Sequence, residues 1–301
     1  MDVALKIRIG VGLSVDGPAA RPDLFGRVVD RCEELGFDSV WLSERVSSPA
    51  PDPLVALAVA AGRTERLKLG TAVLVVPGRN PVLLAKEMAS LDVLSGGRFL
   101  PAVGLGAVDR GEQQAFGVRR EDRGRRLDEA LALMRQCWSG QPVTHHGEFF
   151  DVDEVRVLPL PTQERLDVWL GGIAPSELRR VGRMGDGWIP SFCTPNDVAR
   201  SIPTITEAAV AAGRSIDPQH YGALLTYTDG DVPDRFVKLL ERRRPGVDPR
   251  AVIPTRAGLA DRIREFVDAG ASKFVLLPLL RDTEASDEMS RLADEVLGLE
   301  N

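Results

Sequence analysis

Short runs of apolar and β-branched residues alternate along this chain with stretches whose apolar residues recur at helical spacing. Several runs are almost uninterrupted in Val, Ile and Leu, which is typical of parallel strands covered on both faces. The alternation predicts a parallel α/β fold made of repeated βα units. Eight runs predict strands, at Ile7–Ser14, Ser39–Ser43, Leu67–Val76, Phe99–Leu105, Asp167–Gly171, Gly187–Ser191, Tyr221–Thr228 and Lys273–Pro278.

The helical stretches carry start and stop signals. One helix through Leu35 is followed by Gly36, where a left-handed C-cap would lie. Asp52-Pro53 and Asn80-Pro81 each place a capping side chain before a proline in the first helical turn. The other predicted helices cover Glu121–Trp138, Leu178–Met184, Val198–Ala212, Phe236–Arg243, Leu259–Ala269 and Asp287–Leu297.

Eight βα units in 301 residues predict a (β/α)8 TIM barrel with insertions, in which residues 1–301 form a single domain. A doubly wound open sheet is the alternative. Its dinucleotide fingerprint fails twice, because Val15 and Asp109 stand where the third glycine is required after Gly10-x-Gly12 and Gly104-x-Gly106. The insertions lie near 141–165 and 229–254, and we expect lids or subunit contacts there.

Charge and cysteine content narrow the functional class. A formal charge of −6 gives no basic footprint for nucleic acid, and no apolar run is long enough to span a membrane. The three cysteines are far apart and odd in number, and His145-His146 has no third ligand at metal spacing. We expect reduced thiols, no metal site, no nucleic-acid or membrane partner, and, since the N-terminus lacks a signal peptide, a cytoplasmic location.

In a barrel the active site lies where the strands end on their carboxyl side. The second predicted strand ends at Glu44-Arg45, where an ion pair between the two residues competes with a functional role. The fourth ends at Gly104-Leu105-Gly106, and a flexible turn is the alternative there. These two strand ends are candidate parts of the site.

The fifth predicted strand runs into Gly171-Gly172, and Ile173-Ala174-Pro175 then begins a helix. Ala174 is a poor N-cap, so we expect the first backbone N–H groups of this helix to remain available to an anion. The segment predicts a phosphate-binding turn. A tight turn that needs glycine for steric reasons is the alternative.

Several of these elements together resemble the bacterial luciferase-like superfamily, which includes flavin-dependent monooxygenases and oxidoreductases that use coenzyme F420. The similarity runs in order and spacing from the first strand to about Ile189. It is carried by Gly70-Thr71-Ala72, Asn80-Pro81, Ala85-Lys86, Leu91-Asp92-x-Leu94-Ser95-Gly96-Gly97-Arg98, Gly104-x-Gly106, Arg123-Gly124-Arg125-Arg126-x-Asp128-Glu129, Gly171-Gly172 and Gly185-Asp186-Gly187-Trp188.

The resemblance implies a flavin or deazaflavin ring bound over the strand ends, beside a cis peptide bond between Ala72 and Val73. Glu44 and Arg45 stand where relatives often carry an acidic residue and a histidine, and they are the implied catalytic pair. Arg45 replaces an exchangeable proton site by a permanent cation. The implied cofactor-binding residues are Glu44, Arg45, Ala72, Val73, Gly104, Gly106, Gly171, Gly172, Ile173 and Ile189.

The ratio of arginine to lysine helps to choose between the two possible cofactors, coenzyme F420 and FMN. With 33 Arg and 5 Lys the chain is typical of a GC-rich genome, and deazaflavin enzymes of this superfamily are concentrated in such bacteria. The sequence therefore favours an oxidoreductase that transfers a hydride between coenzyme F420 and a small organic substrate. An FMN-dependent monooxygenase and a barrel that binds a ligand without catalysis remain alternatives.

The substrate is expected to be fairly apolar, and a homodimer is expected because dimers are common among relatives. Ala107 stands where sugar-phosphate-oxidising relatives use a glutamate, which argues against that substrate class. The pocket walls expected from strand-end position are Leu13, Val46, Phe116, Phe192, Cys193 and Tyr227.

Overall fold

Parallel strands form a closed ring in the computed structural model, which describes residues 5–279 and 285–301. Two of the predicted strands are each interrupted, so that β3 and β4 make one barrel strand and β5 and β6 another. The ring strands are β1 (Arg8–Leu13), β2 (Ser39–Leu42), β3 (Lys68–Thr71), β4 (Leu74–Val75), β5 (Phe99–Leu100), β6 (Ala102–Gly104), β9 (Trp169–Leu170), β10 (Gly187–Trp188), β11 (Gly222–Tyr227) and β12 (Lys273–Pro278).

Pairing around the ring establishes the barrel. One sheet runs β11-β12-β1-β2-β3-β5, and a second runs β10-β9-β6-β4. Isolated parallel bridges from Trp188 to Tyr221 and from Ser191 to Leu224 join the two sheets. Because the first strand pairs with the last, Arg8 opposite Lys273, the sheet has no free edge there. The (β/α)8 barrel is therefore confirmed, and the open doubly wound sheet is wrong.

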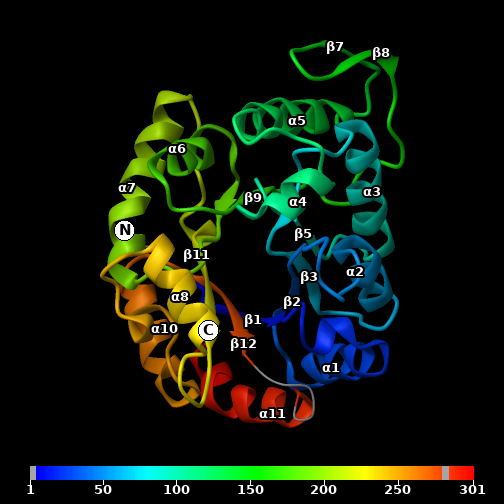
Figure 1. Cartoon of the computed structure of the whole chain (residues 1–301). Helices are drawn as coiled ribbons and strands as arrows, with labels where there is room; N and C mark the ends of the chain where they lie inside the picture. Colours follow the sequence, from blue (N-terminus) through cyan, green and yellow to red (C-terminus); the bar gives the residue numbers. More distant parts are fainter. Residues whose placement is uncertain (1–4, 280–284) are drawn as a thin grey trace.

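Helices cover the outside of the ring (Figure 1). Gly36 ends α1 with a φ of 86°, and the side chains of Asp52 and Asn80 cap α2 and α3, as predicted. The α-helices are α1 (Pro22–Leu35), α2 (Pro53–Ala61), α3 (Pro81–Leu94), α4 (Arg110–Ala115), α5 (Arg123–Cys137), α6 (Pro175–Met184), α7 (Pro195–Ala211), α8 (Asp234–Arg243), α9 (Pro249–Val252), α10 (Leu259–Asp268) and α11 (Ala285–Val296). Short 3-10 helices cover Pro18–Ala20, Pro218–His220, Arg256–Gly258 and Leu297–Leu299.

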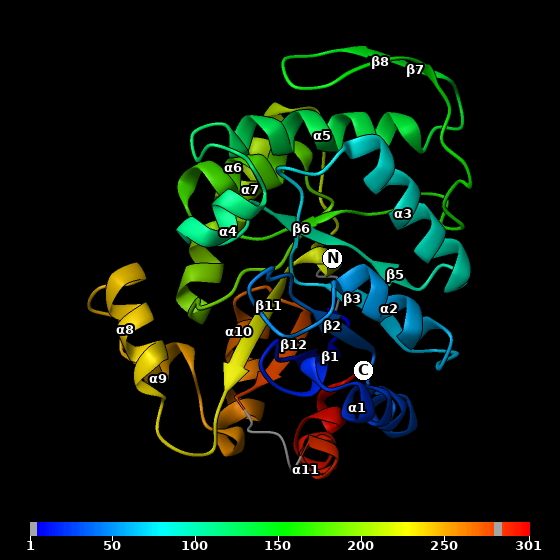
Figure 2. The ribbon, with the colours of Figure 1, turned by 45° about the vertical axis from the view of Figure 1, so that its right-hand side comes forward.

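Both insertions hold regular structure, and the sequence patterns predicted only the helix Phe236–Arg243 in the second one. The first forms an antiparallel hairpin of β7 (Val143–His146) and β8 (Asp151–Val155), which stands out beyond α5 (Figure 2). Glu129 of α5 holds the turn of this hairpin by accepting hydrogen bonds from the backbone N–H groups of Phe149 and Phe150. The second insertion contains α8 and α9, which lie outside the ring.

The barrel has an inner and an outer core. Side chains of a strand alternate between its two sides, and one cluster gathers residues from strands all round the ring: Trp41, Ala102, Trp169, Ile189 and Val275, with Ala72, Val73, Leu100 and Leu224 against them. This cluster fills the interior. The larger cluster, between strands and helices, includes Leu13 and Tyr227. These two residues therefore face the outer core, and their prediction as pocket walls is wrong.

A charged cluster closes the amino-terminal end of the barrel. Asp38, which precedes β2, forms ion pairs with Lys273 of β12 and, at 3.1 Å, with Lys68 of β3. The side chain of Lys273 is 2% exposed and lies 5.7 Å from the ring centre of Trp41. Burial lowers the pKa of Lys273 to about 8, although Asp38 opposes this. The cluster lies at the end of the barrel where conserved residues usually serve stability.

Among residues 5–279 and 285–301, none of the helices combines the length and apolar character needed to cross a membrane.

Candidate active site

The peptide bond between Ala72 and Val73 is cis, as the resemblance implied. The end of β2 holds this segment. The Ser43 hydroxyl donates to the Ala72 carbonyl at 2.6 Å, and the Glu44 N–H donates to the Val73 carbonyl at 3.2 Å. The Val75 N–H in turn donates to Glu44 Oε2 at 2.6 Å. Ser43 and Glu44 thus fix where the Val73 side chain lies.

Val73 lies between glycines of two neighbouring strand ends. A Cβ on Gly104 would fall 2.8 Å from Val73 Cγ2, and one on Gly171 would fall 3.4 Å from Val73 Cγ1 and 3.5 Å from the Ile189 carbonyl oxygen. Val73, Gly104 and Gly171 are all half-buried at the carboxyl end of the barrel. We call Val73, Gly104, Gly171 and Ile189 the Val73 site; it unites four of the residues predicted to bind cofactor.

Glu44 is bonded to Arg79, not to its neighbour Arg45. Arg79 bridges Glu44 and Asp52, the N-cap of α2, and its contact with Asp52 measures 2.9 Å. The Glu44 side chain is 6% exposed. Burial raises the pKa of Glu44 above its usual value against the opposing effects of the Val75 N–H and Arg79. The ion pair between Glu44 and Arg45 that the sequence left open is therefore ruled out.

Arg45 begins an exposed loop that Glu112 of α4 anchors. Glu112 accepts hydrogen bonds from the N–H groups of Val46 and Ser47 at 3.1 and 2.9 Å. It is 3% exposed, and although burial acts to raise its pKa, the Ser47 hydrogen bonds and the Arg45 charge lower it. Arg45 thus lies near Glu112, while its side chain remains open to solvent.

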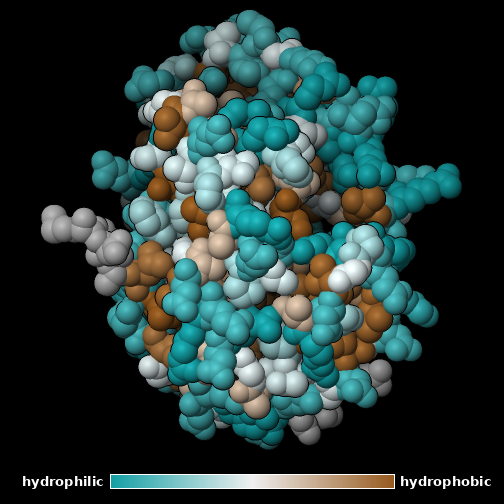
Figure 3. Space-filling view, turned by 90° about the vertical axis from the view of Figure 1, so that its left-hand side faces the viewer, coloured by the Kyte–Doolittle hydropathy of each residue, from teal (hydrophilic) through white to brown (hydrophobic). Residues whose placement is uncertain are grey.

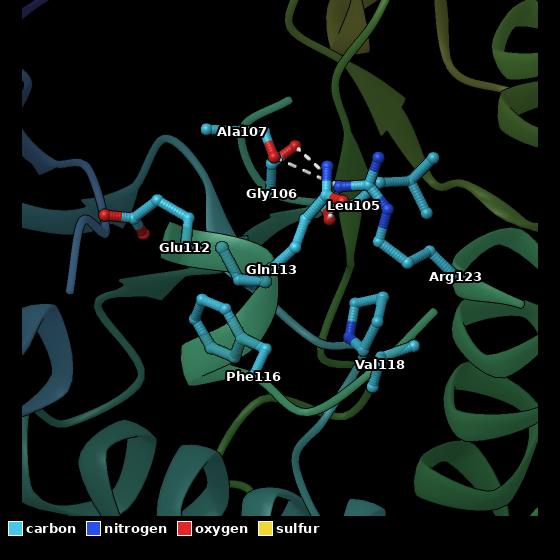
Figure 4. A pocket seen from close by; sticks show the side chains of 10 residues that line it. Leu105, Gly106, Ala107, Glu112, Gln113, Phe116, Val118 and Arg123 are labelled. Atoms are coloured by element: carbon cyan, nitrogen blue, oxygen red, sulfur yellow. Dashed lines mark hydrogen bonds between the residues drawn. The ribbon is translucent and has the colours of Figure 1, made fainter. Parts of the chain in front are cut away.

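A small pocket lies beside Gly106, which follows the end of β6. Its walls include Val75, Gly106, Glu112, Phe116 and Arg123 (Figure 4). Arg123 Nη1 donates to the carbonyls of Leu105 and Ala107, both at 3.1 Å, and Arg123 is 8% exposed. Its Nε has no hydrogen-bond partner. Phe116, which the sequence analysis places in the wall of the substrate pocket, lines this pocket.

The turn before α6 differs from its prediction. Glu177 Oε2 accepts a hydrogen bond from the Ala174 N–H at 3.0 Å, so this group is not available to an anion. Within the described part of the chain, nothing accepts from the N–H groups of Ile173 and Ser176. Gly172 has a φ of 95°, and a Cβ there would lie 2.5 Å from the Glu177 carboxylate. Residues 171–177, the α6 turn, therefore offer N–H groups beside a carboxylate.

The remaining predicted residues lie away from the Val73 site. Ile173 packs partly against the outer core, Cys193 is 2% exposed in the same core, and Phe192 packs near α8 and α9. Val46 is 55% exposed in the loop after β2. In the described ranges, no three His, Cys, Asp or Glu side chains gather where they could hold a metal ion.

Four charged residues of the site were missed from sequence: Arg79, Glu112, Arg123 and Glu177. Glu177 had a local signal, because it stands three residues after the helix N-cap as in a capping box. Arg123 lies in the Arg-Gly-Arg-Arg motif. Nothing local marks Arg79 or Glu112, because their partners are 35 and 66 residues away in sequence.

Residues 1–242 match the family described as luciferase-like monooxygenase. The chain belongs to this family, in keeping with its barrel and its strand-end glycines.

Two named relatives are similar in sequence over part of the chain. An F420-dependent glucose-6-phosphate dehydrogenase of Kineococcus radiotolerans is 33% identical over 205 residues, which is 63% of this chain and 60% of the relative. An F420-dependent hydroxymycolic acid dehydrogenase of Mycobacterium tuberculosis is 33% identical over 225 residues, 71% of this chain and 60% of the relative. The chain thus matches about 60% of the length of these relatives.

Solved structures share the fold over nearly the whole chain. The coenzyme F420-dependent tetrahydromethanopterin reductase of Methanopyrus kandleri aligns with a TM-score of 0.79 and 19% identity, covering 98% of this chain and 100% of that chain. The monooxygenase RslO1 of Streptomyces bottropensis aligns with a TM-score of 0.77 and 22% identity, covering 97% and 99%. At these identities the similarity establishes the barrel and leaves the cofactor open.

Proposed function

We propose that this protein is an oxidoreductase that transfers a hydride between coenzyme F420 and a small, fairly apolar organic substrate. The observation that carries the proposal is the Val73 site, where two strand-end glycines place no side chain beside a half-buried valine. The names of the sequence relatives support the choice of F420.

The residues present fit a planar ring with a phosphate tail. Gly104 and Gly171 carry no side chain on either side of Val73, so a flat ring can approach the backbone there. The N–H groups of Ile173 and Ser176, at the start of α6, are donors for a phosphate. Val73 and Ile189 would support the ring, the α6 turn would hold the phosphate, and Arg45 would face an anionic group of cofactor or substrate.

When bound, coenzyme F420 supplies a ring carbon that accepts or donates a hydride. In the oxidation of an alcohol, a protein base would take the hydroxyl proton, and in the reduction of a carbonyl the same group would return it. We assign the proton to Glu44, a buried carboxylate at the strand ends whose pKa is raised. Val73 and the glycines orient the reactants.

Activity should therefore require ionised Glu44. As pH falls through its raised pKa, the carboxylate takes up a proton and the rate of substrate oxidation is expected to fall. The pH profile of kcat for wild type and Glu44→Gln tests this. We expect the variant to lose the acid limb and most of its rate. An acid limb that persists in the variant would assign it to another group.

The apolar substrate is supported by the side chains around the site. Phe116 and Val75 line the nearby pocket, and Leu224 and Leu100 pack on the inner cluster. Ala107, half-buried after Gly106, supplies no carboxylate for a sugar phosphate.

A titration of the purified protein tests the cofactor. We expect saturable quenching of F420 fluorescence and hydride transfer without oxygen. Tight FMN binding without F420 binding, or oxygen-dependent turnover with reduced FMN, would favour the monooxygenase instead. Binding without any turnover across a broad alcohol and carbonyl panel would favour the non-catalytic barrel.

Arg45→Ala is expected to weaken binding of the cofactor or of an anionic substrate by about 1.5 to 3 kcal/mol, which is the range for hydrogen bonds to charged groups. Arg66→Ala is the control, because Arg66 is 73% exposed at the opposite end of the barrel strands. Calorimetric titration of both variants measures the effect. Equal affinities in Arg45→Ala and wild type would remove Arg45 from the binding site.

We also propose that the protein is a homodimer that associates through α2 and α3. A helix that is apolar all round is normally buried, yet α2 exposes Val55 and Val59 by 62% and 53%, and the adjacent α3 exposes Leu83 and Leu94 by 60% and 74%. The opposite side of the molecule, with α7, mixes hydrophilic and hydrophobic surface (Figure 3).

Val55→Glu is expected to convert the dimer into a monomer, because a charge would be buried at the interface. Val210→Glu is the matched control, since Val210 of α7 is 68% exposed on the other face. Sedimentation velocity distinguishes the two variants. A monomeric wild type, or a dimer in Val55→Glu, would contradict the proposal.

We further propose that the protein is cytoplasmic and that residues 1–301 form one domain. A cytoplasmic location is supported by the three cysteines, which are all unpaired and buried. The single domain is supported by the ring of strands, because its first strand, Arg8–Leu13, pairs with its last strand, Lys273–Pro278.

A further inference from the structure

We propose that Glu177 makes the α6 turn selective for a phosphodiester over a phosphomonoester, and so for coenzyme F420 over FMN. The inference rests on the proposed function, because it concerns the phosphate of the cofactor proposed there. Glu177 would thereby determine which of two cofactors binds, a choice that the N–H groups of the turn alone do not make.

The Glu177 carboxylate lies at the α6 turn itself. It accepts from the Ala174 N–H at 3.0 Å and lies over Gly172, so closely that a Cβ on Gly172 would be 2.5 Å from it. The Trp188 indole N–H fixes this side of the turn by donating to the Gly172 carbonyl at 2.8 Å. An anion that binds the free N–H groups of Ile173 and Ser176 must therefore lie near a negative charge.

A buried arginine, Arg123, interacts with the Glu177 charge. Arg123 lies on α5 and is 8% exposed, and its Nε lacks a hydrogen-bond partner. Arg120 is a further cation that acts on Arg123. The Arg123 charge offsets part of the Glu177 charge, so the ligand experiences the partial positive charge of the helix terminus together with a weakened repulsion from Glu177. That field suits an anion of low charge.

The phosphates of FMN and coenzyme F420 differ in their negative charge. A phosphomonoester such as that of FMN carries nearly two negative charges at neutral pH, because its second pKa is about 6. The phosphodiester of F420 has no second ionisable group and carries one. Because repulsion scales with ligand charge, Glu177 disfavours the dianion twice as strongly in free energy as the monoanion.

The test compares two ligands that share one ring: F420, and the 5′-phosphate of its deazaflavin, which is a monoester. Fluorescence titration gives the Kd of each for wild type and Glu177→Gln at pH 7.5. The amide keeps an acceptor for the Ala174 N–H and removes the charge. We expect the variant to bind the diester about 5-fold more tightly and the monoester about 25-fold more tightly.

The pH dependence provides a second readout. At pH 5.5 the monoester is mostly monoanionic, so its wild-type affinity should rise toward that of the diester. This rise should shrink in Glu177→Gln. Glu207→Gln, an exposed charge removal on α7, is the matched control and should change neither affinity.

Equal shifts of both affinities in Glu177→Gln, or no shift, would overturn the selectivity while leaving the proposed function intact. Failure of wild type to bind either deazaflavin ligand would overturn both. A wild type that prefers the monoester at pH 7.5 would overturn the inference alone.

Discussion

Asp38→Ala is expected to lower the free energy of unfolding by about 3 to 5 kcal/mol, the cost of breaking a buried ion pair on one side. The Asp38 carboxylate pairs with Lys273, whose side chain is 2% exposed, and with Lys68 at 3.1 Å. Without Asp38 the Lys273 ammonium loses its ion-pair partner inside the barrel, and the electrostatic interaction with the Glu300 carboxylate remains. Urea denaturation followed by tryptophan fluorescence measures the loss.

Two variants show whether the buried charge causes this loss. Lys68→Ala removes the partner whose side chain is 42% exposed and should cost less than about 1 kcal/mol. Asp38→Ala combined with Lys273→Met removes both charges and should recover most of the lost stability. A double variant as unstable as Asp38→Ala would show that packing, and not the unpaired charge, sets the cost.

Gly171→Val is expected to weaken cofactor binding about 100-fold while leaving the fold intact. A Cβ at this position meets only ordinary contacts, 3.4 Å from Val73 and 3.5 Å from Ile189, so the protein accommodates it. The added methyl groups would occupy the space proposed for the ring. Overpacking of this kind costs up to about 3 kcal/mol, which corresponds to about 100-fold in Kd.

The control is Gly62→Val, where a Cβ has no neighbour nearer than 3.8 Å at the end of α2. We expect it to bind F420 like wild type. Thermal unfolding of both variants separates binding from folding. Wild-type affinity in a folded Gly171→Val would move the ring away from the Val73 site.

Local signals were sufficient for much of the fold. Gly36, Asp52 and Asn80 end or begin helices through bonds within a few residues, so their roles could be predicted from sequence. The predicted strand Leu67–Val76 is instead broken into β3 and β4 at the Ala72–Val73 bond. The atoms that hold this break belong to Ser43 and Glu44, which no local pattern links to it.

The site was harder to predict because its contacts join distant loops. Sequence adjacency suggested that Glu44 and Arg45 form an ion pair. Successive side chains of an extended strand point to opposite sides, and the cation that reaches Glu44 is Arg79, 35 residues later. The glycines and Val73 were found through the resemblance. The role of Glu112 could not be predicted, because only the folded chain brings α4 next to the loop after β2.

The pairing of β1 with β12 has a consequence for biosynthesis. Arg8 pairs with Lys273, so the ring cannot close until the chain through β12 has left the ribosome. At about 5 to 20 residues per second, β1 waits roughly 13 to 50 s for its partner. During that time its edge and the apolar inner face are open to other nascent chains. Chaperone supply and growth temperature should therefore govern the yield of folded protein more strongly than they govern its stability once made.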